Sequence, residues 1–188
     1  MVLASGSPRR RRILDGLELE FVVDVPDIHE PTVDGELPAE HVVRLARLKA
    51  REVAGRHVRG TIVAADTAVL LGEELLGKPE GRAEAELMLR SLSGRWHEVF
   101  TGVVVIRCSD GALVEGVERT RVMVRDLTEA EIRDYVAGGE PLDKAGAYGI
   151  QDCGSALVSK VSGCFYNVVG LPVTRLLELL KELAAIRE

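Results

Sequence analysis

The sequence has few cysteines, few aromatic residues and no long apolar run. Its three cysteines, Cys108, Cys153 and Cys164, are widely spaced and odd in number, so they form neither a disulfide framework nor a CxxC metal site. There is no run of about 18 apolar residues that could span a membrane, and no signal-peptide pattern. We therefore expect a cytoplasmic protein that does not bind membranes.

The chain also lacks an excess of positive charge. Its net charge of -6 argues against general nucleic-acid binding, which normally requires a basic face. Its four histidines show no ligand spacing with one another or with the cysteines, so a zinc site is not expected. What the sequence does have is enough apolar content, 46% of 188 residues, to bury the core of one domain.

Apolar patterning predicts a single α/β domain over residues 1–188, without repeats or linkers. We expect strands at 1–4, 19–25, 61–66, 97–107, 113–125 and near 156–161, and a hairpin over 68–77. Helices are expected from Pro8 to about Gly16 and over 39–54, 82–92, 129–137 and 172–185. Residues 138–152 are too rich in glycine and alanine to be assigned to a helix or strand.

Four consecutive arginines, residues 9–12, follow the turn SGSP. If Ser7 is the N-cap and Pro8 the first helical residue, these arginines occupy the first helical turn. The positive end of the helix dipole disfavours cations there by a few tenths of a kcal/mol each, unless an anion is bound. The alternative without a ligand is a solvated basic turn that pairs with Asp15 and Glu18.

A bound phosphate would reverse that electrostatic argument. It could accept hydrogen bonds from the N–H groups of the turn, from the hydroxyls of Ser5 and Ser7, and from arginine. Successive helical residues are rotated by about 100°, so all four arginines cannot reach one ligand. We assign the phosphate contact to Arg9 and Arg10.

Acidic and basic side chains elsewhere fit the same chemistry. Asp66 is expected at the C-terminal end of a buried strand, where open α/β sheets place their ligands. Glu30 could join Asp66 in holding a divalent cation, because hard cations select oxygen ligands. Lys49 interrupts an apolar helical face and Lys78 follows a hairpin, although either lysine could instead lie along the surface.

Several motifs follow one another along nearly the whole chain. They are SGSPRR near the N-terminus, LARLKA at 45–50, AADT at 64–67, GKP at 77–79, LSG at 92–94, EPLDKAGAYGIQ at 140–151 and GCFYNVVGLP at 163–172. Together they resemble the Maf family of nucleoside triphosphate pyrophosphatases. The resemblance implies a fold like that of inosine triphosphate pyrophosphatases, an elongated mixed sheet flanked by helices with a cleft between two lobes.

The resemblance also implies a reaction. It is the hydrolysis of a nucleoside triphosphate to the monophosphate and pyrophosphate, with a divalent cation, Mg or Mn, assisting attack of water at the α-phosphorus. Asp66 matches the family's proton acceptor, and Glu30 matches an acidic position near the metal. The phosphate-contacting positions of the family are matched by Ser7, Arg10, Lys49 and Lys78. A homodimer is implied by the resemblance alone.

The family divides by substrate. Arg9, Thr67 and Gln151 match the branch that takes dTTP and UTP, whereas the sister branch prefers 7-methylguanosine triphosphate. The Gln151 amide offers both a donor and an acceptor to the imide edge of uracil or thymine, and Thr67 could add one hydrogen bond. A different class of function also stays open, a nucleotide-binding regulator of cell division and septum formation that acts through a protein partner.

Overall fold

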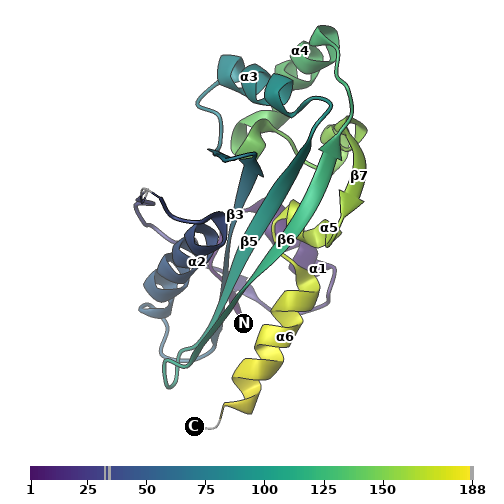
Figure 1. Cartoon of the computed structure of the whole chain (residues 1–188). Coiled ribbons are helices and arrows are strands. Elements are labelled where there is room, and N and C mark those ends of the chain that lie inside the picture. The colour runs from purple at the N-terminus through teal and green to yellow at the C-terminus, as the bar shows by residue number, and fades with distance from the viewer. Residues whose placement is uncertain (32, 34, 187–188) are drawn as a thin grey trace. The chain divides into compact units, whose positions relative to one another are not determined.

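A computed structural model describes residues 1–31, 33 and 35–186 of the chain. It shows the expected α/β architecture, a seven-stranded mixed sheet of order β2-β1-β3-β5-β6-β7 in which β4 pairs with β3 (Figure 1). The strands are β1 (Val2–Leu3), β2 (Val22–Val23), β3 (Thr61–Leu71), β4 (Glu74–Leu76), β5 (Trp96–Arg107), β6 (Leu113–Val124) and β7 (Val158–Ser162). The α-helices are α1 (Pro8–Asp15), α2 (Pro38–Ala54), α3 (Arg82–Leu92), α4 (Glu129–Ala137), α5 (Phe165–Val169) and α6 (Val173–Ala185).

The chain divides into two compact units, each assembled from separate stretches of sequence. Unit 1 consists of Met1–Asp66, Thr101–Glu118 and Gly170–Glu188. Unit 2 consists of Thr67–Phe100 and Arg119–Val169. The expectation of a single domain stays a prediction. Among the described residues, no helix is long and apolar enough to cross a membrane.

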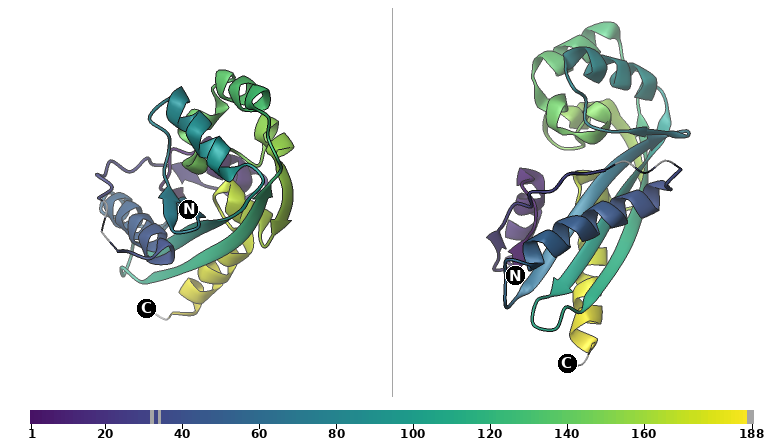
Figure 2. Two further views of the ribbon diagram at one scale, coloured as in Figure 1. Left: turned by 45° about the horizontal axis from the view of Figure 1, so that its top comes forward. Right: turned by 90° about the vertical axis from the view of Figure 1, so that its left-hand side faces the viewer.

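In unit 1, α2 packs against strands whose residues are small or β-branched. Its apolar face carries Ala46, Ala50 and Val53, all fully buried, and contacts a cluster formed by β1, β3 and β5. Helix α6 presents buried leucines as well, and Figure 2 shows α2 and α6 on opposite faces of these strands. Strand β5 is buried at nearly every position because both of its faces are covered.

In unit 2, α3 and α4 lie side by side (Figure 1) and share one apolar cluster with parts of β3, β5 and β6. Helix α4 begins with the capping box that the sequence predicts. The Thr128 hydroxyl accepts from the Glu131 N–H at 3.3 Å, and the Glu131 carboxylate accepts from the Thr128 N–H at 2.8 Å. The other predicted cap, Ser7 with Pro8 at the start of α1, is also confirmed.

The structure differs from the sequence-based expectation in several places, among them helix α5, which the sequence did not predict. The strand expected at 61–66 and the first arm of the hairpin form one continuous strand, β3, because no residue between them breaks the extended backbone. The strand expected at 19–25 is reduced to Val22 and Val23, where it pairs with β1. Residues 138–157 form three short 3-10 helices, η1 (Glu140–Asp143), η2 (Ala145–Ala147) and η3 (Asp152–Leu157).

Gly102 in β5 allows α2 to approach the sheet closely. A Cβ atom at this position would lie 2.5 Å from the Val42 carbonyl group and 2.6 Å from the Val43 nitrogen. We expect Gly102→Ala to lower the free energy of unfolding by about 1–3 kcal/mol, because α2 must move away from the strand. Denaturant unfolding measures this loss. Gly77→Ala is the matched control, since no described atom lies within 4 Å of its Cβ position, and an equal loss in both variants would contradict the close-approach argument.

Candidate functional site

Three charged side chains of unit 1 meet at the ammonium group of Lys49. The Lys49 Nζ lies 2.5 Å from Asp66 Oδ1 and 2.7 Å from Glu30 Oε1. The side chains of Lys49 and Asp66 are each 12% exposed, so water screens this ion pair only weakly. Lys49 is therefore not a surface lysine, and one cation joins both predicted carboxylates.

Pairing between β1 and β3 determines the position of Asp66. The strands run parallel with Leu3 opposite Val63, and the Ala4 N–H donates to the Val63 carbonyl at 2.8 Å. Our expectation that Asp66 ends its strand is wrong, because β3 continues to Leu71. However, Asp66 follows the part of β3 that pairs in parallel with β1. It therefore lies at the carboxyl edge of that strand pair, which is where ligands bind in α/β sheets.

Helix α2 supplies Lys49, and Arg47 fixes the rotation of that helix. Lys49 follows Ala46 by three residues and precedes Ala50 by one, so it borders the apolar face that packs on the sheet. Arg47, from the LARLKA motif, forms a forked ion pair with Glu115 of β6, with distances of 2.8 and 2.5 Å. This pair anchors the helix that carries Lys49.

The first turn of α1 is held together by serine and arginine side chains. The buried Ser5 hydroxyl accepts from the Ser7 N–H at 3.2 Å and from Arg10 Nη1 at 3.2 Å. Arg10 Nε donates to the Gly170 carbonyl at 2.7 Å. The start of α1, the end of β1 and the segment before α6 are thereby joined through one guanidinium group.

The electrostatic surroundings of Arg10 connect it to the carboxylate cluster. Burial lowers the pKa of the Arg10 guanidinium below its ordinary value, and Arg9 lowers it further, whereas Asp66 and Glu30 raise it. Arg10 therefore lies within electrostatic reach of both carboxylates. The N-terminus of α1, with the half-buried Arg9 and Arg10 in its first turn, can hold an anion such as phosphate.

The arginine run divides as helical geometry requires. Arg9 and Arg10 are half-buried, whereas Arg11 and Arg12 are exposed. Arg11 forms a surface ion pair with Asp15 at 3.8 Å. For this residue, the interpretation as part of a solvated basic turn therefore holds. The assignment of Arg9 and Arg10 to a ligand stays a prediction.

The remaining predicted residues belong to unit 2. Thr67 follows Asp66 in β3 and is half-buried, and Lys78 is exposed just after β4. Gln151 directly precedes η3, and its Oε1 is buried without a hydrogen-bond partner among the described residues. In unit 1 the structure joins Ser5, Ser7 and Arg10 in one group, with Arg9 half-buried next in the chain, and Glu30, Lys49 and Asp66 in another. Thr67, Lys78 and Gln151 are described within unit 2 only.

Comparison with known proteins gives the family. Residues 1–183 match the family model described as Maf-like protein. This chain belongs to the Maf family. It is 48% identical over 182 residues to a protein of Symbiobacterium thermophilum, 50% over 181 to one of Myxococcus xanthus and 45% over 187 to one of Geotalea uraniireducens.

These three relatives match along most of their length. The matches cover 97%, 96% and 99% of this chain and 93%, 91% and 96% of the relatives, in the same order. Each of the three is named dTTP/UTP pyrophosphatase. The resemblance seen in the sequence motifs is therefore confirmed as membership of the Maf family.

The donor set of this Maf-family chain fits a hard divalent cation that a ligand helps to hold. Glu30 and Asp66 offer carboxylate oxygens close enough to share one ammonium group. Within the described residues, no group of three or more His, Cys, Asp or Glu side chains could hold a metal ion. Mg²⁺ commonly binds through one or two carboxylates and completes its shell with water and phosphate oxygens, so two carboxylates are enough.

Sequence reasoning missed Arg44 and Glu36, which support the segment that carries Glu30. Arg44 donates to both carboxylate oxygens of Glu36, at 2.6 and 2.7 Å, and to the Pro31 carbonyl at 3.0 Å. His41 Nδ1 lies 3.0 Å from the same carboxylate. The spacing of Arg44 and His41 on α2 places them on one face, but nothing in the sequence identifies Glu36, which precedes the helix, as their partner.

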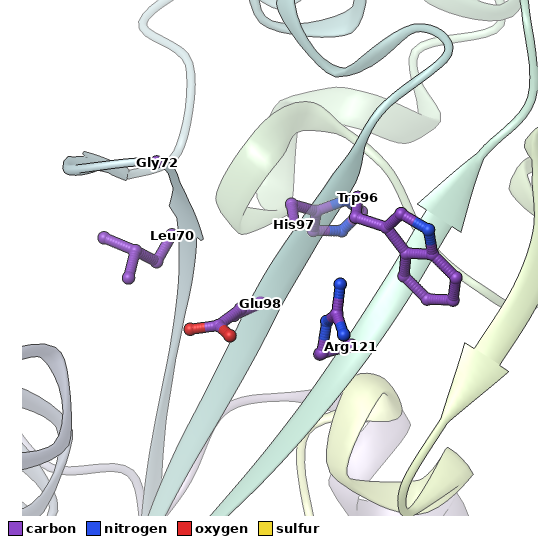
Figure 3. Close-up of a pocket in the computed structure, with 6 residues that line it drawn as sticks. All are labelled: Leu70, Gly72, Trp96, His97, Glu98 and Arg121. Atoms are coloured by element: carbon purple, nitrogen blue, oxygen red, sulfur yellow. The ribbon is translucent and has the colours of Figure 1, made fainter.

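A separate pocket in unit 2 lies beside β5 (Figure 3). It is lined by Leu70, Gly72, Trp96, His97, Glu98 and Arg121. The Arg121 guanidinium lies 4.8 Å from the centre of the Trp96 ring, a cation–π contact. His97 is buried, and its Nε2 lies 2.7 Å from the Tyr148 hydroxyl. None of the residues predicted for the nucleotide site lines this pocket.

His97 makes the stability of the protein depend on pH. Burial lowers its pKa from 6.5 to about 4, so the folded protein keeps the imidazole neutral while the unfolded chain takes up a proton. We expect the free energy of unfolding to fall as the pH is lowered from 6.5 to 4, the window set by that shift. The part due to His97 is at most about 3 kcal/mol. Denaturant unfolding of the unaltered chain and of His97→Gln across this range measures it, and parallel pH profiles for the two proteins would contradict the expectation.

Proposed function

We propose that this chain hydrolyses dTTP and UTP to the nucleoside monophosphate and pyrophosphate. The observation that carries the proposal is the cluster of Asp66, Lys49 and Glu30 within electrostatic reach of Arg10. It combines a shielded carboxylate with cations suited to a triphosphate. The names of the three Maf-family relatives support the choice of substrate.

The triphosphate is bound by hydroxyl and cationic groups at the start of α1 and by two lysines. We assign phosphate contacts to the hydroxyls of Ser5 and Ser7, to the side chains of Arg9 and Arg10, and to the two lysines Lys49 and Lys78. The first turn of α1 adds its N–H groups and its dipole. Thr67 and Gln151 are assigned to the pyrimidine base, with Arg9 as a further determinant of the dTTP and UTP preference.

Glu30 and Asp66 would hold a divalent cation, Mg or Mn, together with phosphate oxygens. When bound, such a cation neutralises phosphate charge and lowers the pKa of a coordinated water. Lys49 is placed to exchange its contact with these carboxylates for one with a phosphate, because it approaches both at hydrogen-bonding distance.

Asp66 is the proposed proton acceptor for the water that attacks the α-phosphorus. Its Oδ1 accepts from Lys49, and the move of Lys49 to a phosphate would release that oxygen to take the proton. The departing pyrophosphate gains negative charge, and Arg10 and the lysines stabilise that charge by positions fixed before the reaction. A cytoplasmic location, a homodimer and the absence of nucleic-acid partners stay predictions.

A panel of nucleoside triphosphates assayed with Mg or Mn tests this function. We expect the release of pyrophosphate, fastest with dTTP or UTP, and a fall in kcat of on the order of 100-fold or more in Asp66→Asn, because an amide cannot accept the proton. Release of single phosphates, or undiminished turnover in Asp66→Asn, would overturn the mechanism. Nucleotide binding without turnover would favour the regulator of cell division, and a preference for 7-methylguanosine triphosphate would favour the sister branch.

The division of the arginine run gives a second test with a matched control. Arg10→Ala is expected to lower kcat/KM for UTP on the order of 100-fold, because it removes a fixed cation from the triphosphate. Arg12→Ala, on the exposed side of the same helix, should stay within about two-fold of the unaltered chain. Steady-state pyrophosphate release measures both, with melting temperatures recorded alongside. Activity that survives Arg10→Ala and is lost in Arg12→Ala would show that the run is divided at the wrong place.

A further inference from the structure

Residues 149–154, which include Gln151, are held by two side chains of unit 2. The Tyr135 hydroxyl accepts from the Gly149 N–H at 3.1 Å and donates to Glu140 Oε1 at 3.0 Å. The same Oε1 accepts from the Gly154 N–H at 3.3 Å. Tyr135 and Glu140 therefore hold the backbone at both ends of the segment, with Gln151 between these points.

The packing of this segment leaves little room for an alternative backbone path. A Cβ atom on Gly154 would lie 2.1 Å from the Gly149 carbonyl oxygen and 2.7 Å from the Tyr135 hydroxyl. A Cβ atom on Gly149 would lie 2.7 Å from Lys144 Cε. Gly154 is thus required for the close approach of the segment to its supports, whereas a Cβ atom on Gly149 would meet the far end of the Lys144 side chain.

The backbone beside Gln151 is in a conformation that needs such support. Asp152, the next residue, has φ of 53°, and Ala147 has φ of 57°, both in the left-handed region that side chains other than glycine seldom adopt. Conformations of this kind persist where surrounding contacts determine them, and they are common at functional sites. Burial raises the pKa of Tyr135, so its hydroxyl keeps the proton that it donates to Glu140.

The Gln151 side chain has a hydrogen-bond acceptor, Oε1, that could accept from a ligand. Its Oε1 is buried and accepts no hydrogen bond from the described residues. A buried acceptor without a donor costs free energy, so a ligand that supplies an N–H group gains from meeting it. Uracil and thymine carry an imide N–H on their pairing edge, whereas cytosine has only a lone pair at the same ring position.

We infer that Tyr135 and Glu140 are positioning residues that hold Gln151 so that its amide selects the imide edge of uracil and thymine over cytosine. This inference rests on the proposed function. It extends the specificity site to two further side chains. Tyr135 precedes the motif EPLDKAGAYGIQ, and Glu140 is the first residue of that motif. Neither residue touches the base; both act through the backbone at Gly149 and Gly154.

The test compares kcat and KM for UTP, dTTP and CTP in three variants and a control. In Tyr135→Phe, which loses both hydrogen bonds of the hydroxyl, we expect KM for UTP to rise about ten-fold and the preference for UTP over CTP to fall by a similar factor. kcat for UTP should change less than about two-fold, because the residues assigned to the phosphates and to the attacking water are unaltered. Hydrogen exchange at the Gly149 amide should quicken in the same variant.

Glu140 allows a conservative rescue. Glu140→Gln keeps a side-chain oxygen that can accept from Tyr135 and Gly154, whereas Glu140→Ala has no such oxygen. Glu140→Gln should therefore retain more of the UTP preference. Val124→Ala, a core truncation in β6 whose side chain forms no hydrogen bonds, controls for lost stability. It should lower the melting temperature and leave the ratio of UTP to CTP unchanged.

Three results would overturn the inference, and the last of them is distinguishable from the first two. If the unaltered chain prefers UTP and Tyr135→Phe keeps that preference while melting at a lower temperature, Tyr135 is only structural and the inference fails alone. Equal selectivity in Glu140→Gln and Glu140→Ala counts against it in the same way. If the unaltered chain releases pyrophosphate from no nucleotide, the proposed function fails and the inference with it.

Discussion

The contact of one lysine with two carboxylates organises unit 1. Removing Lys49 and Asp66 from water costs several kcal/mol per charge unless each finds a partner, so α2, β3 and the segment with Glu30 must meet with good geometry. Arg47 anchors the helix to Glu115, and Arg44 holds the backbone beside Glu30 through Glu36 and Pro31. These supports hold the three charged side chains in place, and such a cluster is well suited to bind a charged ligand and a cation.

A different constraint acts in unit 2, where residues 138–157 form only short 3-10 helices. Irregular backbone leaves N–H and C=O groups that must be satisfied by side chains when they are buried. Tyr135 and Glu140 satisfy those of Gly149 and Gly154, and in doing so they fix Gln151. The hydrogen bonds that allow the segment to be buried are thus the same bonds that orient the side chain assigned to the base.

Much of the fold follows from local chemistry. Helical and strand periodicity, the Ser7–Pro8 cap and the Thr128–Glu131 capping box predict element type correctly because each depends on neighbours a few residues apart. The errors arise where distant contacts decide. Val22 and Val23 are a strand only where β1 lies beside them, and Asp66 lies within β3 because the strand and the following hairpin join.

The sequence by itself determined which residues could carry the chemistry, since the turn SGSPRR, the aspartate at 66 and the family motifs are properties of residue type and order. Only the tertiary structure decided that Glu30 and Asp66 share Lys49, that Arg10 turns inward while Arg11 and Arg12 stay in water, and that Tyr135 supports Gln151. Those relations join residues far apart in the chain. They depend on burial, which gives charges and hydrogen bonds their strength and which no short stretch of sequence specifies.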